Sequence, residues 1–277
     1  AVKEEMMASQ KKEKKKKTVG DLILTLILLI AIGVFCFAAY NLIHIYLEYK
    51  KGSDEYSALE QMAVTERAPD QMGDDSDDSG RALPTPPISV DFLPLRQVNE
   101  DVVGWIYMEA LPSISYPMVK AEDNDYYLHR TYEGTSNFAG AIFLDYENSA
   151  DFSDCNTIIY GHNMIDGSMF GLLSRYISQD AYKTSKYFWI FTPEMNYRYE
   201  IFSAYRTEIN SDTYRLFLGP SDEFLEYLNL MKSWSQIQTD AVEMKITDRI
   251  ATLSTCTDDS TARLIVQGRV VDEVPVK

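Results

Sequence analysis

Cys256, His162 and Arg263 are the residues of this chain whose types and sequence surroundings point to chemistry. A thiolate is a strong nucleophile, and a neighbouring imidazolium or guanidinium lowers the pKa of a thiol. A guanidinium also stabilises the oxyanion that forms when a thiolate attacks a carbonyl. An imidazolium protonates a leaving amine. Together the three residues predict nucleophilic acyl transfer, with Cys256 as nucleophile, His162 as acid/base and Arg263 as electrostatic stabiliser.

A predicted hairpin must position two of these residues. An alternating strand over 242–254 delivers Cys256 to a strand end, and after the polar loop 257–261 the chain returns as a strand over 264–271. Hairpin geometry brings Arg263 back near Cys256. Arg269 shares the face of Arg263 but lies roughly 20 Å further along. His162 follows the predicted strand 157–160 and Gly161. Each residue alone is more common in packing or in solvent, so the prediction depends on their adjacency.

Neither of the other two cysteines is expected to form a disulfide with Cys256. Cys36 lies inside a long apolar run. An extended run from Cys155 to His162 covers roughly 23 Å. A Cys256 beside His162 is therefore too far from Cys155 for a disulfide, which needs Cα atoms within about 7 Å. We expect Cys155 to be a small, partly buried thiol. With only three histidines in the chain, we expect neither a metal nor a cofactor.

Residues 90–277 predict one mainly β domain with helical additions. Eight runs of apolar or β-branched residues, separated by turn residues, are expected to be strands. Three stretches are expected to be helical, and the longest, over 221–235, has Ser221 as a capping residue. Eight strands without obvious crossover helices favour a closed antiparallel or mixed barrel. The strand ranges are 103–107, 114–119, 141–144, 157–160, 187–192, 197–205, 242–254 and 264–271, and the shorter helical ranges are 124–130 and 169–176.

The segments before this domain predict a membrane anchor. The 26 basic and 42 acidic residues give a net charge of −16, so nucleic acid is not an expected partner. Residues 22–47 contain no charged side chain and are long enough to cross a ~30 Å hydrocarbon core. Residues 1–21 are rich in lysine, so the positive-inside rule predicts a cytoplasmic tail, a single membrane pass and an extracellular domain. A cleaved signal peptide is the alternative, but its apolar region is usually shorter.

Residues 48–89 combine an acidic, glycine- and serine-containing run with Pro84, Pro86 and Pro87 after it. This composition predicts a solvated stalk. The four aspartates between positions 74 and 78 admit a calcium-binding alternative, but the run lacks the glycine and the closing glutamate of an EF-hand loop.

Four ordered sequence motifs and one predicted helix resemble those of the sortases of Gram-positive bacteria. TLSTC at 252–256, followed by Arg263, resembles the TLxTC…R signature of that family, and NTIIYGHNM at 156–164 resembles its histidine segment. DGSMFGLL at 166–173, NDYYLHR at 124–130 and the helix at 221–235 resemble class B sortases specifically. The resemblance covers residues 90–277. It implies an eight-stranded sortase-type β-barrel behind a single-pass membrane anchor in the cell membrane.

The resemblance also implies a cysteine transpeptidase. Cys256 is then expected to attack the Thr carbonyl of a C-terminal sorting motif on a secreted protein and to form a thioester. An amine of a peptidoglycan precursor resolves that thioester. By match to family positions, Ser254, Asn124 and Leu128 are expected to line the substrate groove. Two features depart from the family. Only six residues separate Cys256 from Arg263, and this short connection predicts a trimmed groove wall. In addition, Thr257 stands where some members carry an acidic residue.

Three alternatives remain open at the level of sequence. A sortase that polymerises pilins uses a pilin lysine as the acceptor amine. A cysteine protease uses water. A non-enzymatic, membrane-tethered binding domain leaves Cys256 inert. Thiol reactivity separates the last from the others, and product analysis with and without an amine separates the protease.

Overall fold

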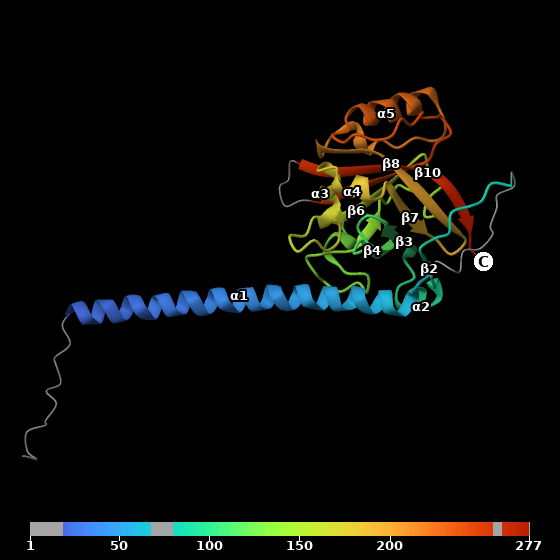
Figure 1. The fold of residues 1–277 in the computed structure, drawn as a ribbon. Coiled ribbons are helices and arrows are strands. Elements are labelled where there is room, and N and C mark those ends of the chain that lie inside the picture. The colour runs from blue at the N-terminus through green and yellow to red at the C-terminus, as the bar shows by residue number, and fades with distance from the viewer. Residues whose placement is uncertain (1–18, 68–79, 257–261, 277) are drawn as a thin grey trace, which may run out of the picture. The chain divides into compact units, whose positions relative to one another are not determined.

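Eight strands close into a mixed barrel in the order β10-β8-β7-β3-β4-β5-β6-β9 (Figure 1). The computed structural model describes residues 19–67, 80–256 and 262–276. Most neighbouring strands are antiparallel, whereas β4 pairs with β5 and β6 pairs with β9 in parallel. The predicted eight-stranded barrel is thereby confirmed. Its strands are β3 (Val102–Met108), β4 (Ser115–Val119), β5 (Ile142–Leu144), β6 (Asn156–His162), β7 (Tyr187–Phe191), β8 (Met195–Glu208), β9 (Ile250–Cys256) and β10 (Ala262–Pro275).

The strand expected over 242–254 is shorter in the structure, because β9 begins only at Ile250. Val242 and Met244 are buried, but they pack into a separate hydrophobic cluster and do not pair with a neighbouring strand. A turn follows, in which the N–H of Asp248 donates to the carbonyl of Lys245. The alternation of apolar residues before Ile250 therefore reflects packing against a helix and not membership of the barrel.

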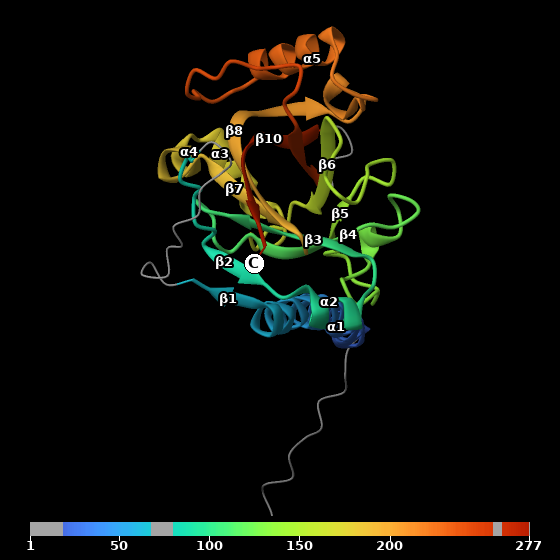
Figure 2. The same ribbon diagram turned by 90° about the vertical axis from the view of Figure 1, so that its right-hand side faces the viewer.

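Helix α5 (Asp222–Ser233) lies against β8 at one end of the barrel (Figure 2). Ser221 caps it as predicted, because its Oγ accepts from the N–H of Phe224 at 3.1 Å. The stretches expected as helices over 124–130 and 169–176 contain only single turns. These and the other short elements are α2 (Phe92–Val98), η2 (Tyr127–His129), η3 (Gly171–Leu173), α3 (Ser174–Ile177), α4 (Asp180–Thr184) and η4 (Asp212–Tyr214).

Residues 48–66 differ from the solvated stalk that their composition suggests. Helix α1 (Val19–Ala63) continues through them, and β1 (Val64–Glu66) pairs antiparallel with β2 (Ile88–Val90). One face of this end of α1 is buried, with side chains three or four positions apart along the helix. These buried residues are Gly52, Glu55, Tyr56, Leu59 and Ala63. Acidic residues lie between these buried positions, so the overall composition of the segment does not reveal its buried face. Residues 68–79, with the aspartates of the calcium alternative, lie outside the described residues.

The described chain divides into two compact units between Leu47 and Glu48. The first contains the apolar part of α1, which is long and apolar enough to cross a membrane and is not buried in the protein. A signal sequence near an N-terminus has the same properties, so this helix suggests a membrane anchor without establishing one. Residues 1–18, which hold most of the predicted lysine-rich tail, lie outside the described residues.

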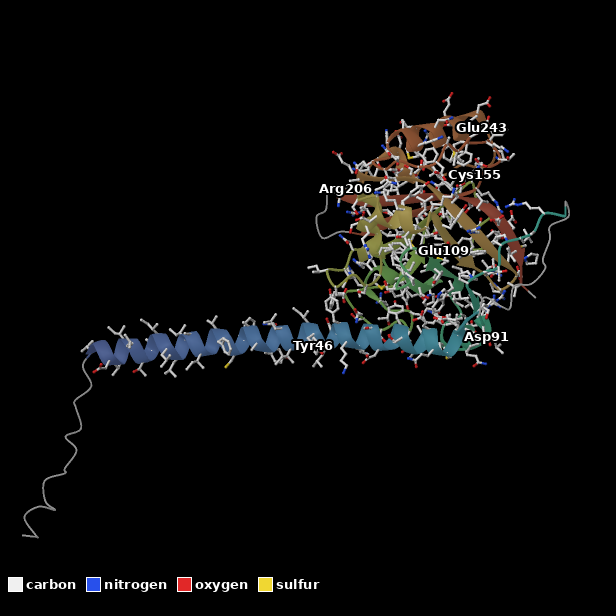
Figure 3. The ribbon with its side chains drawn as sticks, in the orientation of Figure 1. Tyr46, Asp91, Glu109, Cys155, Arg206 and Glu243 are labelled. Carbon is white, nitrogen blue, oxygen red and sulfur yellow. The ribbon has the colours of Figure 1, made fainter. Side chains whose placement is uncertain are left out.

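Two hydrophobic clusters fill the second unit. The larger includes the fully buried Trp105, Trp189 and Phe188, which lie on β3 and β7. The smaller lies beneath α5 and includes Phe224 of the helix and Cys155, which is labelled in Figure 3. A closed barrel leaves few unpaired strand edges, so the ends of β6, β9 and β10 hold their side chains at fixed positions.

Candidate functional site

The strand register places His162, Cys256 and Arg263 at adjacent positions. In the parallel β6–β9 ladder, His162 is the direct partner of Cys256. Neighbouring strands lie about 4.8 Å apart, so the backbones of these two residues are direct neighbours in the sheet. In the antiparallel β9–β10 ladder, Ile265 is the partner of Ser254. Continuing that register by two residues brings Arg263 opposite Cys256, so Cys256 lies between the other two.

A groove of about 440 Å³ opens over this end of the barrel. Both His162 and Arg263 line it. Its other lining residues come from η2 and the segment before it, from β5 and β6, and from the β8–α5 connection; they are Asn124, Asp125, Leu128, His129, Phe143, Tyr160, Ile209 and Tyr214. The loop 257–261, including Thr257 and the short connection that predicts a trimmed wall, lies outside the described residues.

The imidazole of His162 is oriented by the backbone of η2. Its Nε2 lies 2.7 Å from the carbonyl oxygen of Leu128. Because a carbonyl only accepts, Nε2 carries a proton in this contact. The ring of His129 stacks on the other side, with ring centroids 5.9 Å apart. The imidazole is therefore held in one orientation, as an acid/base requires.

Arg263 and Arg269 occupy different parts of β10. Nη1 of Arg263 donates to the carbonyl of Ala262 at 3.0 Å, and its side chain lines the groove. Arg269 pairs in the ladder with Ile250, at the opposite end of β9 from Cys256. It binds the carboxylate of Glu200 at 3.3 Å. Only Arg263 is therefore placed to act beside Cys256.

Comparisons with known proteins identify the family of this chain. The family model for the sortase domain matches residues 107–271. The chain belongs to the sortase family. Sortase B of Listeria monocytogenes is 39% identical over 180 residues, which cover 64% of this chain and 72% of that protein. Sortase B of Staphylococcus aureus is 28% identical over 251 residues, which cover 90% and 96% of the two chains.

Solved structures give the same class. A crystal structure of sortase B from Bacillus anthracis in complex with AAEK1 has a TM-score of 0.67 and 30% identity, and the match covers 82% of this chain and 99% of that one. A complex of Staphylococcus aureus sortase B with a substrate has a TM-score of 0.61 and 33% identity, over 65% and 84% of the two chains. The protein is a class B sortase, a cysteine transpeptidase with the barrel of that family.

Of the three residues expected to bind the substrate, two lie on the wall of the groove that His162 and Arg263 line. Asn124 and Leu128 are both on its wall. Asn124 is held by Nδ2, which donates to Oδ2 of Asp145 at 2.9 Å. Ser254, the third, is fully buried, and its Oγ lies 2.9 Å from the hydroxyl of Tyr214. Ser254 therefore supports a residue of the groove wall and is not itself on the surface of the groove.

Several groove residues of the sortase were not anticipated from sequence. Tyr160 lies two positions before His162 on β6, so period-2 alternation places both on one face and gives a usable signal. Its hydroxyl donates to Oδ2 of Asp145 at 2.9 Å. Ile209 and Tyr214 come from the β8–α5 connection, more than 40 residues from His162, and no local pattern marks them.

Cys155 is buried and free at the far end of β6 from His162. Its carbonyl accepts from the N–H of Ile250, at the start of β9, at 2.9 Å. The partner thiol for a disulfide would be six residues away along that strand, at Cys256. Burial, followed by the charge of Asp154, raises the pKa of the Cys155 thiol. The small thiol that the sequence predicts at Cys155 therefore lies in a buried position. Among the described residues, no cluster of three or more His, Cys, Asp or Glu side chains is arranged to hold a metal.

Proposed function

We propose that Cys256 is the nucleophile of this sortase, with His162 as acid/base and Arg263 as the stabiliser of the oxyanion. The observation that carries the proposal is the strand register, which brings Cys256 between His162 of β6 and Arg263 of β10. A second observation supports it, because His162 and Arg263 both line one groove of about 440 Å³. A thiolate between an imidazolium and a guanidinium is stabilised electrostatically.

The reaction proceeds through two acyl transfers. The Cys256 thiolate attacks the carbonyl carbon of Thr in a C-terminal sorting motif, and Arg263 stabilises the oxyanion that develops. The C–N bond then breaks as the imidazolium of His162 protonates the leaving amine, which leaves a thioester. An acceptor amine attacks the thioester, loses a proton to His162 and forms a new amide as the thiolate departs. The chemistry is balanced without an oxidant, metal or cofactor.

We propose a secreted protein with a C-terminal sorting signal as the donor and the amine of a peptidoglycan precursor as the acceptor. Membership in the class B sortases supports this pairing. The groove residues Phe143, Tyr160 and Tyr214 supply aromatic surface for a peptide backbone and its side chains. The lysine amine of a pilin is the competing acceptor, and the experiment below tests it separately.

The test uses the full chain in detergent micelles. Peptides with NPxTN-, LPxTG- and PPxTG-like motifs are incubated with a glycine peptide amine, with a peptide lysine amine, or with no amine, and products are identified by mass spectrometry. We expect cleavage after Thr and joining of the glycine amine to the new end. Cys256→Ala and His162→Ala are each expected to abolish both products, while circular dichroism shows an unchanged fold.

Each other outcome reassigns the function. Joining to the lysine amine alone selects the pilin-polymerising alternative. Hydrolysis that no amine diverts selects a protease. Normal cleavage by Cys256→Ala refutes the mechanism, and an unreactive Cys256 with no product for any peptide refutes the enzyme and favours a binding domain.

We also propose that residues 22–47 anchor the sortase in the cell membrane with the catalytic domain outside. The apolar helix within α1 supports the anchor, and the excess of lysine in residues 1–21 supports a cytoplasmic N-terminus. Protease added to intact cells should digest the catalytic domain and leave an N-terminal epitope tag protected. A protected catalytic domain refutes the orientation.

A further inference from the structure

The end of α1 that packs on the barrel contacts the loop that borders the proposed acid/base. This docking segment comprises residues 48–63, and the loop comprises residues 131–141, between η2 and β5. Three hydrogen bonds join them, from the docking segment's backbone and from two of its side chains. Glu48 O accepts from Asn137 Nδ2 at 2.8 Å, Glu55 Oε1 accepts from the N–H of Glu133 at 2.9 Å, and the Tyr56 hydroxyl donates to Gly140 O at 2.9 Å.

Gly140 lies directly against both the imidazole of His162 and the carbonyl that orients it. A Cβ on Gly140 would stand 2.5 Å from the oxygen of Leu128 and 3.1 Å from Cδ2 of His162. The residue has a φ of +60°, which places its backbone in the left-handed region. The position of the Gly140 peptide therefore sets the space available to the Leu128 carbonyl and to the ring that binds it.

Tyr56 of the docking segment holds the Gly140 peptide in place. Its side chain is 7% exposed, and its hydroxyl bond to the Gly140 carbonyl is buried. A continuous contact chain thus runs from the Tyr56 hydroxyl through Gly140 and the Leu128 carbonyl to Nε2 of His162.

A second set of contacts leads from the same side chain to the backbone of His162. The ring of Tyr56 packs edge-on against Tyr116, with centroids 5.4 Å apart. The Tyr116 hydroxyl accepts from the N–H of Met169 at 3.1 Å. The next residue, Phe170, donates its N–H to the carbonyl of His162 at 2.9 Å. Tyr56 therefore supports both the ring and the backbone of His162.

We propose that Tyr56 is a positioning residue of the transpeptidase, which holds the imidazole of His162 in its reactive orientation through the Gly140 peptide. This role rests on the proposed function of His162. It assigns the docking segment a part in catalysis that its sequence, which is acidic and lies outside the four family-like segments, does not indicate.

The experiment compares Tyr56→Phe with Tyr132→Phe in the full chain in detergent micelles. The matched control loses a buried tyrosine hydroxyl of the same kind, because Tyr132 donates to the carbonyl of Leu95 at 2.7 Å. We expect Tyr56→Phe to lower kcat about 3- to 10-fold, as befits one hydrogen bond, with little change in KM for the sorting peptide. Tyr132→Phe is expected to keep the wild-type kcat.

A spectroscopic readout separates positioning from general stability. The chain has only three histidines, so ¹³C-labelled histidine gives a spectrum that His162→Ala assigns directly. The His162 resonance should move in Tyr56→Phe and stay in place in Tyr132→Phe. Equal kcat in wild type and Tyr56→Phe, an equal loss in both variants, or an unmoved His162 resonance each overturns the proposal. A wild-type chain that forms no product refutes the proposed function instead, while the resonance still reports whether Tyr56 positions the ring.

Discussion

Gly140→Ala tests whether the close packing beside His162 sets the rate. Gly140 has a φ of +60°, where an alanine costs roughly 1–2 kcal/mol. The new Cβ would also stand 2.5 Å from the carbonyl oxygen of Leu128 and 2.8 Å from that of Tyr127, which are backbone atoms. Relieving such overpacking costs typically 1–3 kcal/mol. The sum is about 2–5 kcal/mol, so a domain of ordinary stability remains folded.

The matched control is Gly134→Ala in the same loop. Gly134 has a φ of +77°, but a Cβ there would meet only the Tyr126 hydroxyl, at 3.6 Å. This variant therefore carries the backbone cost without the steric one. The difference in stability should be about 1–3 kcal/mol, which lowers the Tm of Gly140→Ala by roughly 2–12 °C below that of the control, at about 2–4 °C per kcal/mol.

The larger effect is expected on catalysis. The 2.7 Å contact between the Leu128 carbonyl and His162 lies beside the new methyl group, so the carbonyl or the ring must shift. Loss of a hydrogen bond to a charged imidazole, worth roughly 1.5–3 kcal/mol, lowers kcat about 10- to 150-fold. Thermal melts and steady-state kinetics with the cleaved peptide measure both quantities. If Gly140→Ala and Gly134→Ala have the same kcat, the Gly140 contact does not orient the acid/base and the reasoning fails.

Three further predictions concern single side chains. Arg263→Lys should lower kcat about 10²-fold, because one ammonium does not reproduce the planar fork of a guanidinium. A variant with the wild-type kcat in steady-state kinetics would show that Arg263 has no part in the mechanism. Burial raises the pKa of Glu55, so its contribution to stability is present at low pH and is lost as pH rises through the pKa of the folded state. In urea unfolding, Glu55→Gln should therefore gain stability relative to the wild type as pH rises from below the ordinary pKa of a glutamate to above the raised pKa of Glu55, and a difference that does not change with pH contradicts this. In a Cys36→Ala background, an alkylating reagent at pH 7 should modify one thiol, and mass spectrometry detects the modification. Cys256→Ala should abolish this modification, whereas Cys155→Ala should preserve it. Modification of the buried Cys155 thiol would refute the prediction that this thiol is unreactive.

The sequence alone predicted the barrel and the strands that carry its candidate chemistry-bearing residues. Strand periodicity is a local property, so all eight strands were anticipated, most to within a few residues. The hairpin argument also placed Arg263 beside Cys256 and excluded Arg269, because strand spacing is fixed by backbone geometry. His162 followed from its motif, but its direct pairing with Cys256 is a parallel contact between segments 94 residues apart, which no local pattern reveals.

Only the tertiary structure decided where residues 48–63 and 242–249 belong. Both segments pack one face on a neighbour: Tyr56 and Leu59 on the barrel, and Val242 and Met244 beneath α5. Composition suggests a stalk for the first and alternation suggests a strand for the second, because burial depends on partners that are distant in sequence. Burial also decided the role of Ser254. Its match to a family position predicts a groove residue, but in the structure Ser254 is buried and its hydroxyl contacts that of Tyr214. Local periodicity thus predicts most of the barrel strands, whereas long-range packing decides how segments such as 48–63 and 242–249 fold and which side chains reach the groove.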